Sequence, residues 1–300
     1  MIQMAHHHQP TSGKRIFWVT LLNAGITLTE IIGGLLSGSL SLLSDAIHNL
    51  SDTVSIAFSY VAQRIGAKGR TPQKTYGYKR AEILAAFVNA VVLIGLSIFL
   101  LIEAVERFFV PETIDGNLML IVALIGLVAN LVSVLLLQQD AHNSLNIRSS
   151  YLHLLSDTLS SIGVILGALL IRFFQIYWID PLITLLVSLY IMKEAYDVVK
   201  ETVGILMQSA PELDYETIAA RICQLPGIEN VHHLHAWQID EATIIFDAHI
   251  LVKDQAVSDI EKLYDTIAAI LKEYGISHVT LQPEVYRDQR EGLFHLTDES

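Results

Sequence analysis

Residues 40–61 have the sequence LSLLSDAIHNLSDTVSIAFSYV, an apolar stretch that contains two carboxylates and an imidazole. A helix needs about 20 mostly apolar residues to cross a bilayer, and this stretch is long enough. Asp45, His48 and Asp52 lie inside it, and an ionised side chain at the centre of a membrane helix costs about 2.5–3.5 kcal/mol on insertion scales. The stretch therefore predicts a membrane helix that carries a functional or paired polar site.

Apolar segments of similar length recur along the first 200 residues. They cover about residues 16–36, 81–102, 118–137, 151–171 and 179–199. The composition agrees, because only 17% of the residues are charged, whereas soluble domains carry about 25%. The sequence predicts an α-helical membrane protein with six transmembrane helices.

Basic residues are distributed unevenly around the predicted spans. The loop between the second and third spans carries six Lys and Arg residues from Arg64 to Arg80, whereas the turn Ser37-Gly38-Ser39 is uncharged. Lys and Arg of short loops favour the cytoplasmic side. We therefore expect both chain termini to be cytoplasmic.

The chain changes character near Gln208. The last hundred residues account for the whole net charge of −12, because the first 200 hold equal numbers of acidic and basic residues. Acidic residues after Pro211 open a short helix, and residues 228–239 and 243–252 alternate like strands. An amphipathic helix over 256–274 and a strand over 277–283 complete a small α+β domain. Such a small core favours association with a second copy.

The predicted domain organisation has four parts. Residues 1–14 form a disordered N-terminal tail, 15–207 the six-span transmembrane domain, 208–288 the cytoplasmic α+β domain and 289–300 a C-terminal tail. His6, His7 and His8 in the first part either attract metal or are incidental.

Several classes of function are disfavoured by composition. The acidic tail domain argues against nucleic-acid binding, which requires a basic face. The single cysteine, Cys223, excludes an internal disulfide and a CxxC metal clamp. No HExxH motif is present, which argues against a membrane metalloprotease.

Two of the predicted spans hold the same motif. His48 and Asp52 are four residues apart, and so are His153 and Asp157. This spacing places both side chains of a pair on one helical face. Two such helices facing each other would supply two imidazoles and two carboxylates, a set suited to tetrahedral zinc. A single buried His–Asp pair is often structural, but two identical pairs on separate spans favour a binding site.

Charge balance suggests what competes with the metal. Two carboxylates and two neutral imidazoles sum to −2, so a divalent cation neutralises them, and protons can replace the cation when it leaves. Asp45 lies on nearly the same face as His48 and is either an orienting group or an alternative ligand. Glu30 joins a proton path, caps a helix or makes an interhelical hydrogen bond. Asn89 and Asn130 are expected to join helices.

These motifs resemble the cation diffusion facilitator family of metal–proton antiporters. The resemblance covers about residues 14–285. Its most specific parts are the run from Gly33 to His48, the two His-x-x-x-Asp pairs, Tyr76–Glu82 and His232–Trp237. It implies six spans, a metallochaperone-like cytoplasmic domain and a homodimer. It also implies a transport site at His48, Asp52, His153 and Asp157, with zinc as first cargo and cobalt or cadmium as secondary cargo.

The resemblance extends to the cytoplasmic domain and has two departures. It implies metal binding at a dimer interface by His232, His249, His278 and Glu284. Some members carry another site in the loop between spans two and three, but Lys74, Tyr76 and Tyr78 occupy the matching positions, and none is a good metal ligand. The loop around residues 138–148 is short, which resembles prokaryotic members and suggests a bacterial inner membrane.

The sequence therefore predicts a secondary transporter, not an enzyme. It would export divalent transition-metal cations from the cytoplasm across the lipid bilayer in exchange for protons. The alternative is a membrane-bound metal sensor without transport, although a sensor has no need of ligands deep in two spans. A channel is disfavoured, because a four-ligand site that strips water from the cation favours slow exchange over conduction.

Overall fold

The computed structural model describes residues 11–138, 145–286 and 292–294. Contacts divide the chain into two compact units, each described by itself below. The first comprises residues up to Tyr60 together with Ala85–Val199, and the second comprises Val61–Leu84 together with residues from Lys200 on.

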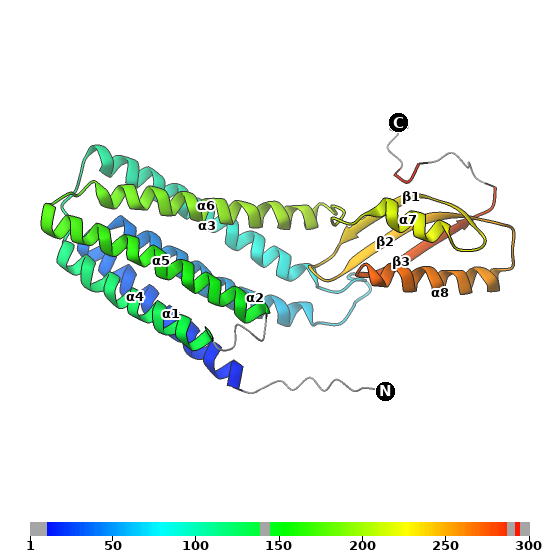
Figure 1. Ribbon diagram of the computed structural model, residues 1–300, viewed down its shortest axis with the longest axis horizontal. Coiled ribbons are helices and arrows are strands. Elements are labelled where there is room, and N and C mark those ends of the chain that lie inside the picture. The colour runs from blue at the N-terminus through cyan, green and yellow to red at the C-terminus, as the bar shows by residue number, and fades with distance from the viewer. Residues whose placement is uncertain (1–10, 139–144, 287–291, 295–300) are drawn as a thin grey trace. The chain divides into compact units, whose positions relative to one another are not determined.

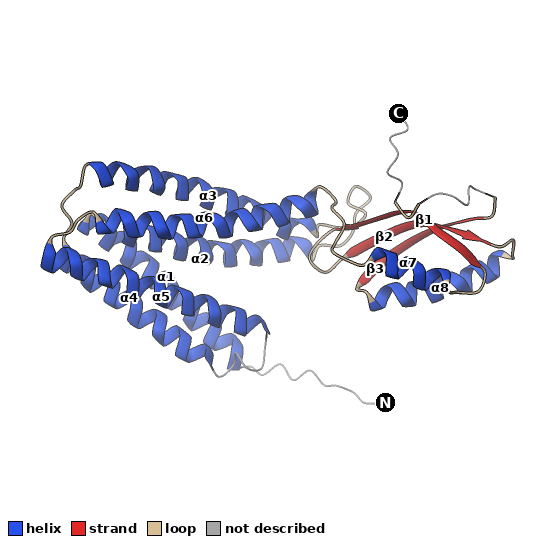
Figure 2. Ribbon diagram, turned by 45° about the horizontal axis from the view of Figure 1, so that its top comes forward, coloured by secondary structure: helices blue, strands red, loops and turns tan. Residues whose placement is uncertain are grey.

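Six long helices form the first unit, and one end of the second, third and sixth of them belongs to the second unit. α4 lies beside both α1 and α5 (Figures 1 and 2). Met119 of α4 and Val164 of α5 are fully buried in a common apolar cluster with Leu42 of α2. The helices are α1 (Thr11–Ser37), α2 (Leu40–Gly66), α3 (Arg80–Phe109), α4 (Gly116–Gln138), α5 (Leu145–Phe174) and α6 (Ile179–Leu206).

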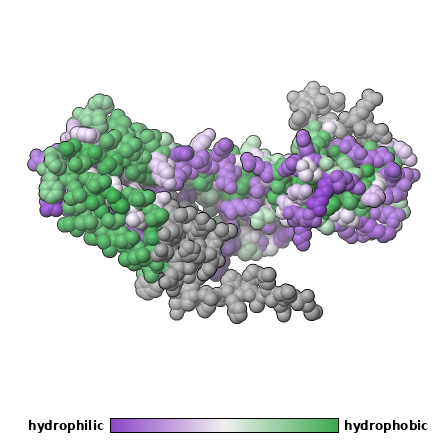
Figure 3. Space-filling model, in the orientation of Figure 1, coloured by the Kyte–Doolittle hydropathy of each residue, from purple (hydrophilic) through white to green (hydrophobic). Residues whose placement is uncertain are grey.

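The outer surface of this unit is apolar. Figure 3 shows mostly hydrophobic residues on the visible face of these helices. Large side chains such as Leu35, Phe99 and Leu159 are more than half exposed. A soluble domain rarely exposes apolar patches of this extent, whereas a bilayer solvates them.

Among the described residues, three helices are long and apolar enough to span a membrane by length and composition alone. They are Arg80–Phe109, Gly116–Leu136 and Leu154–Phe174. α2 and α6 fall short because polar residues interrupt them, among them Asp45 and Asp52 in α2 and Lys193, Glu194 and Asp197 in α6. In α1 the apolar segment Leu21–Ser37 is shorter. The six predicted spans are thus all long helices, and two of them, α2 and α6, are interrupted by charged residues.

The two predicted terminal tails lie mostly outside the described residues. α1 begins at Thr11, inside the segment 1–14 predicted to be disordered, because the membrane helix continues for a turn before its apolar stretch. Residues 1–10, with the three adjacent histidines, lie outside the described part, and so does most of 289–300.

The second unit contains the predicted α+β domain. Both of its short helices, α7 (Tyr215–Cys223) and α8 (Val257–Glu273), lie on one face of a three-stranded sheet (Figure 2). The strands β1 (Ile228–Gln238), β2 (Ile244–Val252) and β3 (Ile276–Glu284) lie in the order β1-β2-β3. β1 runs antiparallel to β2, and β3 runs parallel to it.

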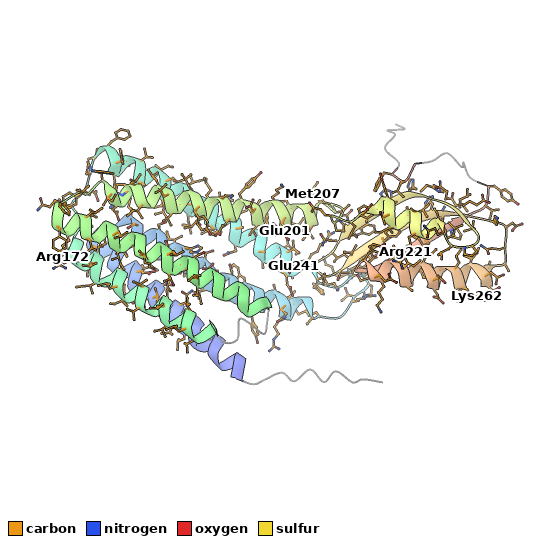
Figure 4. The ribbon with its side chains drawn as sticks, viewed as in Figure 1. Arg172, Glu201, Met207, Arg221, Glu241 and Lys262 are labelled. Carbon is orange, nitrogen blue, oxygen red and sulfur yellow. The ribbon has the colours of Figure 1, made fainter. Side chains whose placement is uncertain are left out.

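Buried apolar residues and helix caps hold this unit together. Ile222 of α7 and Leu271 of α8 pack against Phe246 of β2, and all three are fully buried. Arg221 of α7, which is labelled in Figure 4, also donates a hydrogen bond to Glu273 of α8 at 2.7 Å. α7 begins at Tyr215, four residues after Pro211, because the Asp214 side chain caps it.

Candidate metal sites

The two predicted ligands of α2 lie one turn apart. Nε2 of His48 is 3.9 Å from Oδ2 of Asp52, and the His48 side chain is largely buried. The α-helical repeat of 3.6 residues places both on the same side of α2. The face of α2 that they share is therefore polar.

α5 supplies a carboxylate to the same point. Oδ1 of Asp157 lies 3.4 Å from Nε2 of His48, and the Asp157 side chain is only 5% exposed. The faces of α2 and α5 that carry the His-x-x-x-Asp motifs are therefore turned toward each other. His153 lies one turn before Asp157 on α5, but its side chain is outside the described part of the chain.

A cavity of about 200 Å³ opens on this site. His48 and Asp52 line it from α2, Asn89 lines it from α3, and Glu194 lines it from α6. A cavity of this size holds several water molecules. Water can thus reach the imidazole and one carboxylate of the site.

Glu30 and Asp45 lie behind the ligands. Both are almost fully buried, and Nδ2 of Asn49 donates to Oε2 of Glu30 at 2.9 Å. The side chain of Glu30 also packs closely against α4 at Gly126. A Cβ atom added to this glycine would lie only 2.7 Å from Oε1 of Glu30. The predicted interhelical hydrogen bond of Glu30 is thus present, between α1 and α2.

The two predicted connecting asparagines both join helices. Nδ2 of Asn89 on α3 donates to Oγ of Ser55 on α2 at 2.6 Å and to Oγ of Ser51 at 3.1 Å. Nδ2 of Asn130 on α4 donates to Oγ of Ser161 on α5 at 3.4 Å. These contacts hold α2 and α5, which carry the site, against their neighbours.

A second cluster lies in the α+β domain. Nδ1 of His249 on β2 is 3.1 Å from Oε1 of Glu284 on β3, and Nε2 of His232 on β1 is 3.3 Å from Oε2 of the same carboxylate. One potential ligand atom from each residue lies within 4.8 Å of the others. The three strands thus bring together two imidazoles and a carboxylate that can hold a divalent cation.

A β-bulge shapes this cluster. His232 pairs with His249 and His235 pairs with Asp247, so β1 has one residue more than β2 between these pairs. His233 takes up the extra length with a φ of 50°, and its ring stacks on His249 at 4.6 Å between centroids. Sequence reasoning missed His233 at this cluster, because neighbouring strand residues normally point to opposite faces.

The other predicted ligand of this domain lies elsewhere. His278 pairs with Ile245 in the sheet, six residues before Glu284 on β3, and its ring contacts Tyr76 edge-on at 5.9 Å. His278 is therefore not part of the three-residue cluster. Burial raises the pKa of the Cys223 thiol on α7, which disfavours the thiolate form that binds metals.

Comparison with known proteins defines the class to which this fold and this site belong. Residues 16–207 match the model of the cation efflux transmembrane domain, and residues 210–286 match that of the cation efflux protein cytoplasmic domain. The chain belongs to the cation diffusion facilitator family. It is a multi-pass membrane protein of metal cation efflux, not an enzyme.

Individual relatives cover almost the whole chain. A Bacillus subtilis cadmium, cobalt and zinc/H(+)-K(+) antiporter is 40% identical over 286 residues, which are 94% of this chain and 92% of that protein. The Escherichia coli zinc transporter ZitB is 37% identical over 293 residues, covering 94% and 93%. The metal cation efflux system protein CzcD of Cupriavidus metallidurans is 35% identical over 282 residues, covering 93% and 89%.

Proposed function

We propose that this protein exports divalent transition-metal cations, zinc first, from the cytoplasm in exchange for protons. The transport site would consist of His48, Asp52, His153 and Asp157. One observation carries the proposal: the imidazole of His48 on α2 lies 3.4 Å from the carboxylate of Asp157 on α5. Ligands from two different helices meet there, so a relative movement of these helices can open or close the site.

The charge of the proposed site supports protons as the exchanged ion. Two carboxylates and two neutral imidazoles carry −2, which a divalent cation cancels. An empty site of that charge is unfavourable in a low-dielectric interior, because each buried ion loses several kcal/mol of hydration. Protons that bind the same side chains restore neutrality after the metal has left. Metal and protons then compete for one set of groups and move in opposite directions.

Glu30 and Asp45 offer a route for those protons. Both are buried beside the site, and Asn49 holds the carboxylate of Glu30 in place. Carboxyl groups that water reaches poorly and that lie next to a cation site are suited to passing protons inward. Asp45 could alternatively accept the cation itself while a neighbouring ligand is protonated.

The donor set favours zinc. Two nitrogen and two oxygen donors suit a tetrahedral ion of intermediate softness, whereas magnesium and calcium prefer more oxygen ligands. The names of the relatives include zinc, cadmium and cobalt. We therefore propose that this chain also transports cobalt and cadmium as secondary cargo.

The α+β domain would bind cytoplasmic metal at His232, His249 and Glu284. Cation binding there would favour an active geometry of a homodimer. This assignment requires that both chain termini lie in the cytoplasm. The basic loop between α2 and α3 indicates that orientation. The membrane would be a bacterial inner membrane.

Zinc flux into proteoliposomes tests the transport proposal. The purified protein should accumulate zinc when the lumen is acidic, and collapse of the proton gradient should abolish that uptake. Asp157→Ala should show no flux, whereas the control Glu106→Ala, an exposed acid of α3, should transport like the parent protein. Flux that is indifferent to the gradient would rule out proton exchange.

The same experiment distinguishes a transporter from the alternative, a metal sensor without transport. A sensor would bind zinc at the cytoplasmic cluster and show no flux in any gradient. Expression in a zinc-sensitive strain adds a second readout, because an exporter raises zinc tolerance and a sensor alone does not.

A further inference from the structure

Asp180 is a buried carboxylate far from the proposed ligands. It lies in the first turn of α6 and is fully buried. Its Oδ1 accepts hydrogen bonds from the hydroxyls of Ser39 and Ser41, each at 2.6 Å. The backbone N–H groups of Leu40 and Ser41 also donate to this carboxylate, at 2.8 Å and 3.2 Å. Ser39 directly precedes α2, and the other donors lie in its first turn.

These contacts complete the N-terminus of α2. The first N–H groups of a helix have no partner within it. Asp180 accepts from the first two, and Oγ of Ser39 accepts from the third, Leu42, at 3.3 Å. The positive end of the helix dipole also favours a carboxylate at this position. α6 therefore supplies most of the cap of α2 from across the bundle.

A second contact joins the same two helices one turn further on. Oγ of Ser44 on α2 lies 3.4 Å from Oγ of Ser188 on α6, and both residues are fully buried. The turn before α2 is also held, because Nη1 of Arg107 on α3 donates to the carbonyl of Gly38 at 2.6 Å. The N-terminal end of α2 is thus fixed by charged groups from α3 and α6.

The anchored end determines where His48 lies. Ser44 and His48 are four residues apart and share a face of α2. His48 follows Leu40 by eight residues, which is about 12 Å along a helix axis at about 1.5 Å per residue. A slip of α2 by one residue would turn His48 by about 100° and take it away from Asp157.

We propose that Asp180 is a positioning residue of the transport site. Its carboxylate clamps the start of α2 to α6 and so fixes the rotation and depth of His48 and Asp52 relative to α5. Four hydrogen bonds already occupy this carboxylate, which disfavours a role as a carrier of protons or cations. This inference rests on the proposed transport site, and cobalt binding tests it separately from flux.

Cobalt spectroscopy is the main test. Tetrahedral Co²⁺ absorbs strongly in the visible range, so it reports ligand geometry without transport. Measurements would use a His232→Ala/His249→Ala background, which removes the cytoplasmic cluster. Asp180→Asn should weaken cobalt affinity about tenfold or more, as the loss of groups that orient ligands does. Asp197→Asn, the same substitution at an exposed position of α6, should leave the spectrum unchanged.

Two further measurements separate positioning from other roles. Residual transport by Asp180→Asn should keep the pH profile of the parent. A shifted profile with an unchanged cobalt spectrum would overturn the proposal in favour of proton transfer. If the parent protein shows no proton-driven flux, the transport proposal fails, while the cobalt result still decides the role of Asp180.

A double variant covers the case in which loss of Asp180 impairs folding. Asp180→Ala/Ser39→Asp supplies an acidic cap from the residue directly before α2, but it removes the Asp180 carboxylate that joins α2 to α6. We expect it to recover thermal stability and to keep the defective cobalt spectrum. Recovery of the spectrum as well would show that capping suffices, and it would overturn positioning by α6.

Discussion

The two candidate metal sites are built from the same groups in different surroundings. In the bundle, His48 lies 3.4 Å from Asp157, and in the α+β domain, His232 lies 3.3 Å from Glu284. The first pair joins two long helices with apolar outer surfaces, and the second joins strands of one sheet. Helices that contact through side chains can shift relative to each other, whereas hydrogen-bonded strands keep their register.

This difference indicates different tasks. A site between two helices can open and close, so it can take up and release a cation. A site fixed within a sheet changes only its occupancy, so it is suited to sensing the cation concentration. The two constructions support the proposed transport and regulatory roles, and variants of each site can test the division.

The largest effect is expected at His48. His48→Ala removes one of the four proposed ligands and its contact with Asp157 of α5. Zinc flux should therefore fall more than about 100-fold, since the loss of even an outer partner of a ligand costs about 10–100-fold. Zinc binding to the α+β domain, measured by titration calorimetry on the same protein, should be unchanged. Loss of both would contradict independent sites.

The reverse pattern is expected at Glu284. Glu284→Gln keeps the shape of the side chain but removes the charge that His232 and His249 share. Zinc affinity of the cytoplasmic cluster should fall about 10–100-fold, while zinc flux falls only a few-fold. Calorimetry in a His48→Ala background measures the first effect, and flux measures the second. Abolished flux would indicate that the cluster is an obligatory step of transport.

The two sites also differ in how far the sequence predicts them. The contact between His48 and Asp157 follows from a helical spacing that occurs in two predicted spans, because periodicity identifies the face on which each side chain lies. The six helices and the order of elements in the α+β domain follow from the same periodicities. The positions at which the helices end are less certain, as the start of α1 at Thr11 illustrates.

Contacts that depend on register cannot be predicted in this way. The bulge at His233 and the parallel pairing of Leu251 with Glu284 bring the cytoplasmic cluster together, and neither has a local signal in the sequence. Without that register, the sequence cannot separate His278 from the residues of the cluster. The contacts of Asp180 have no local signal either, because an acidic residue in the first turn of a helix is ordinarily favourable to its own helix.

A smaller effect is expected at His233. Its φ of 50° is tolerated by Asn, Asp, His and Gly but is unfavourable for a β-branched residue. His233→Val should therefore cost about 1–2 kcal/mol and weaken zinc binding to the cluster about tenfold. His233→Gly permits the same backbone and isolates the contribution of the ring that stacks on His249. Equal affinities for the two variants would show that the ring, not the bulge, matters.

The smallest effect is expected at Asp214, which lies outside both sites. Hydrogen bonds from the side chain and the backbone N–H of Thr217 hold the pKa of the Asp214 carboxyl below its usual range. A depressed pKa means that the ionised form stabilises α7. This contribution is therefore present above the ordinary pKa of about 3.9 and is lost as the pH falls through the lower pKa of the folded state.

Asp214→Asn retains a cap but not the charge. Exchange of the Thr217 and Ile218 amide hydrogens should be slightly faster in this variant at neutral pH and equal to the parent below that range. A difference in exchange rate that persists in acid would mean that the shape of the cap, rather than its charge, stabilises α7. The zinc affinities of both metal sites should be unaffected in either case.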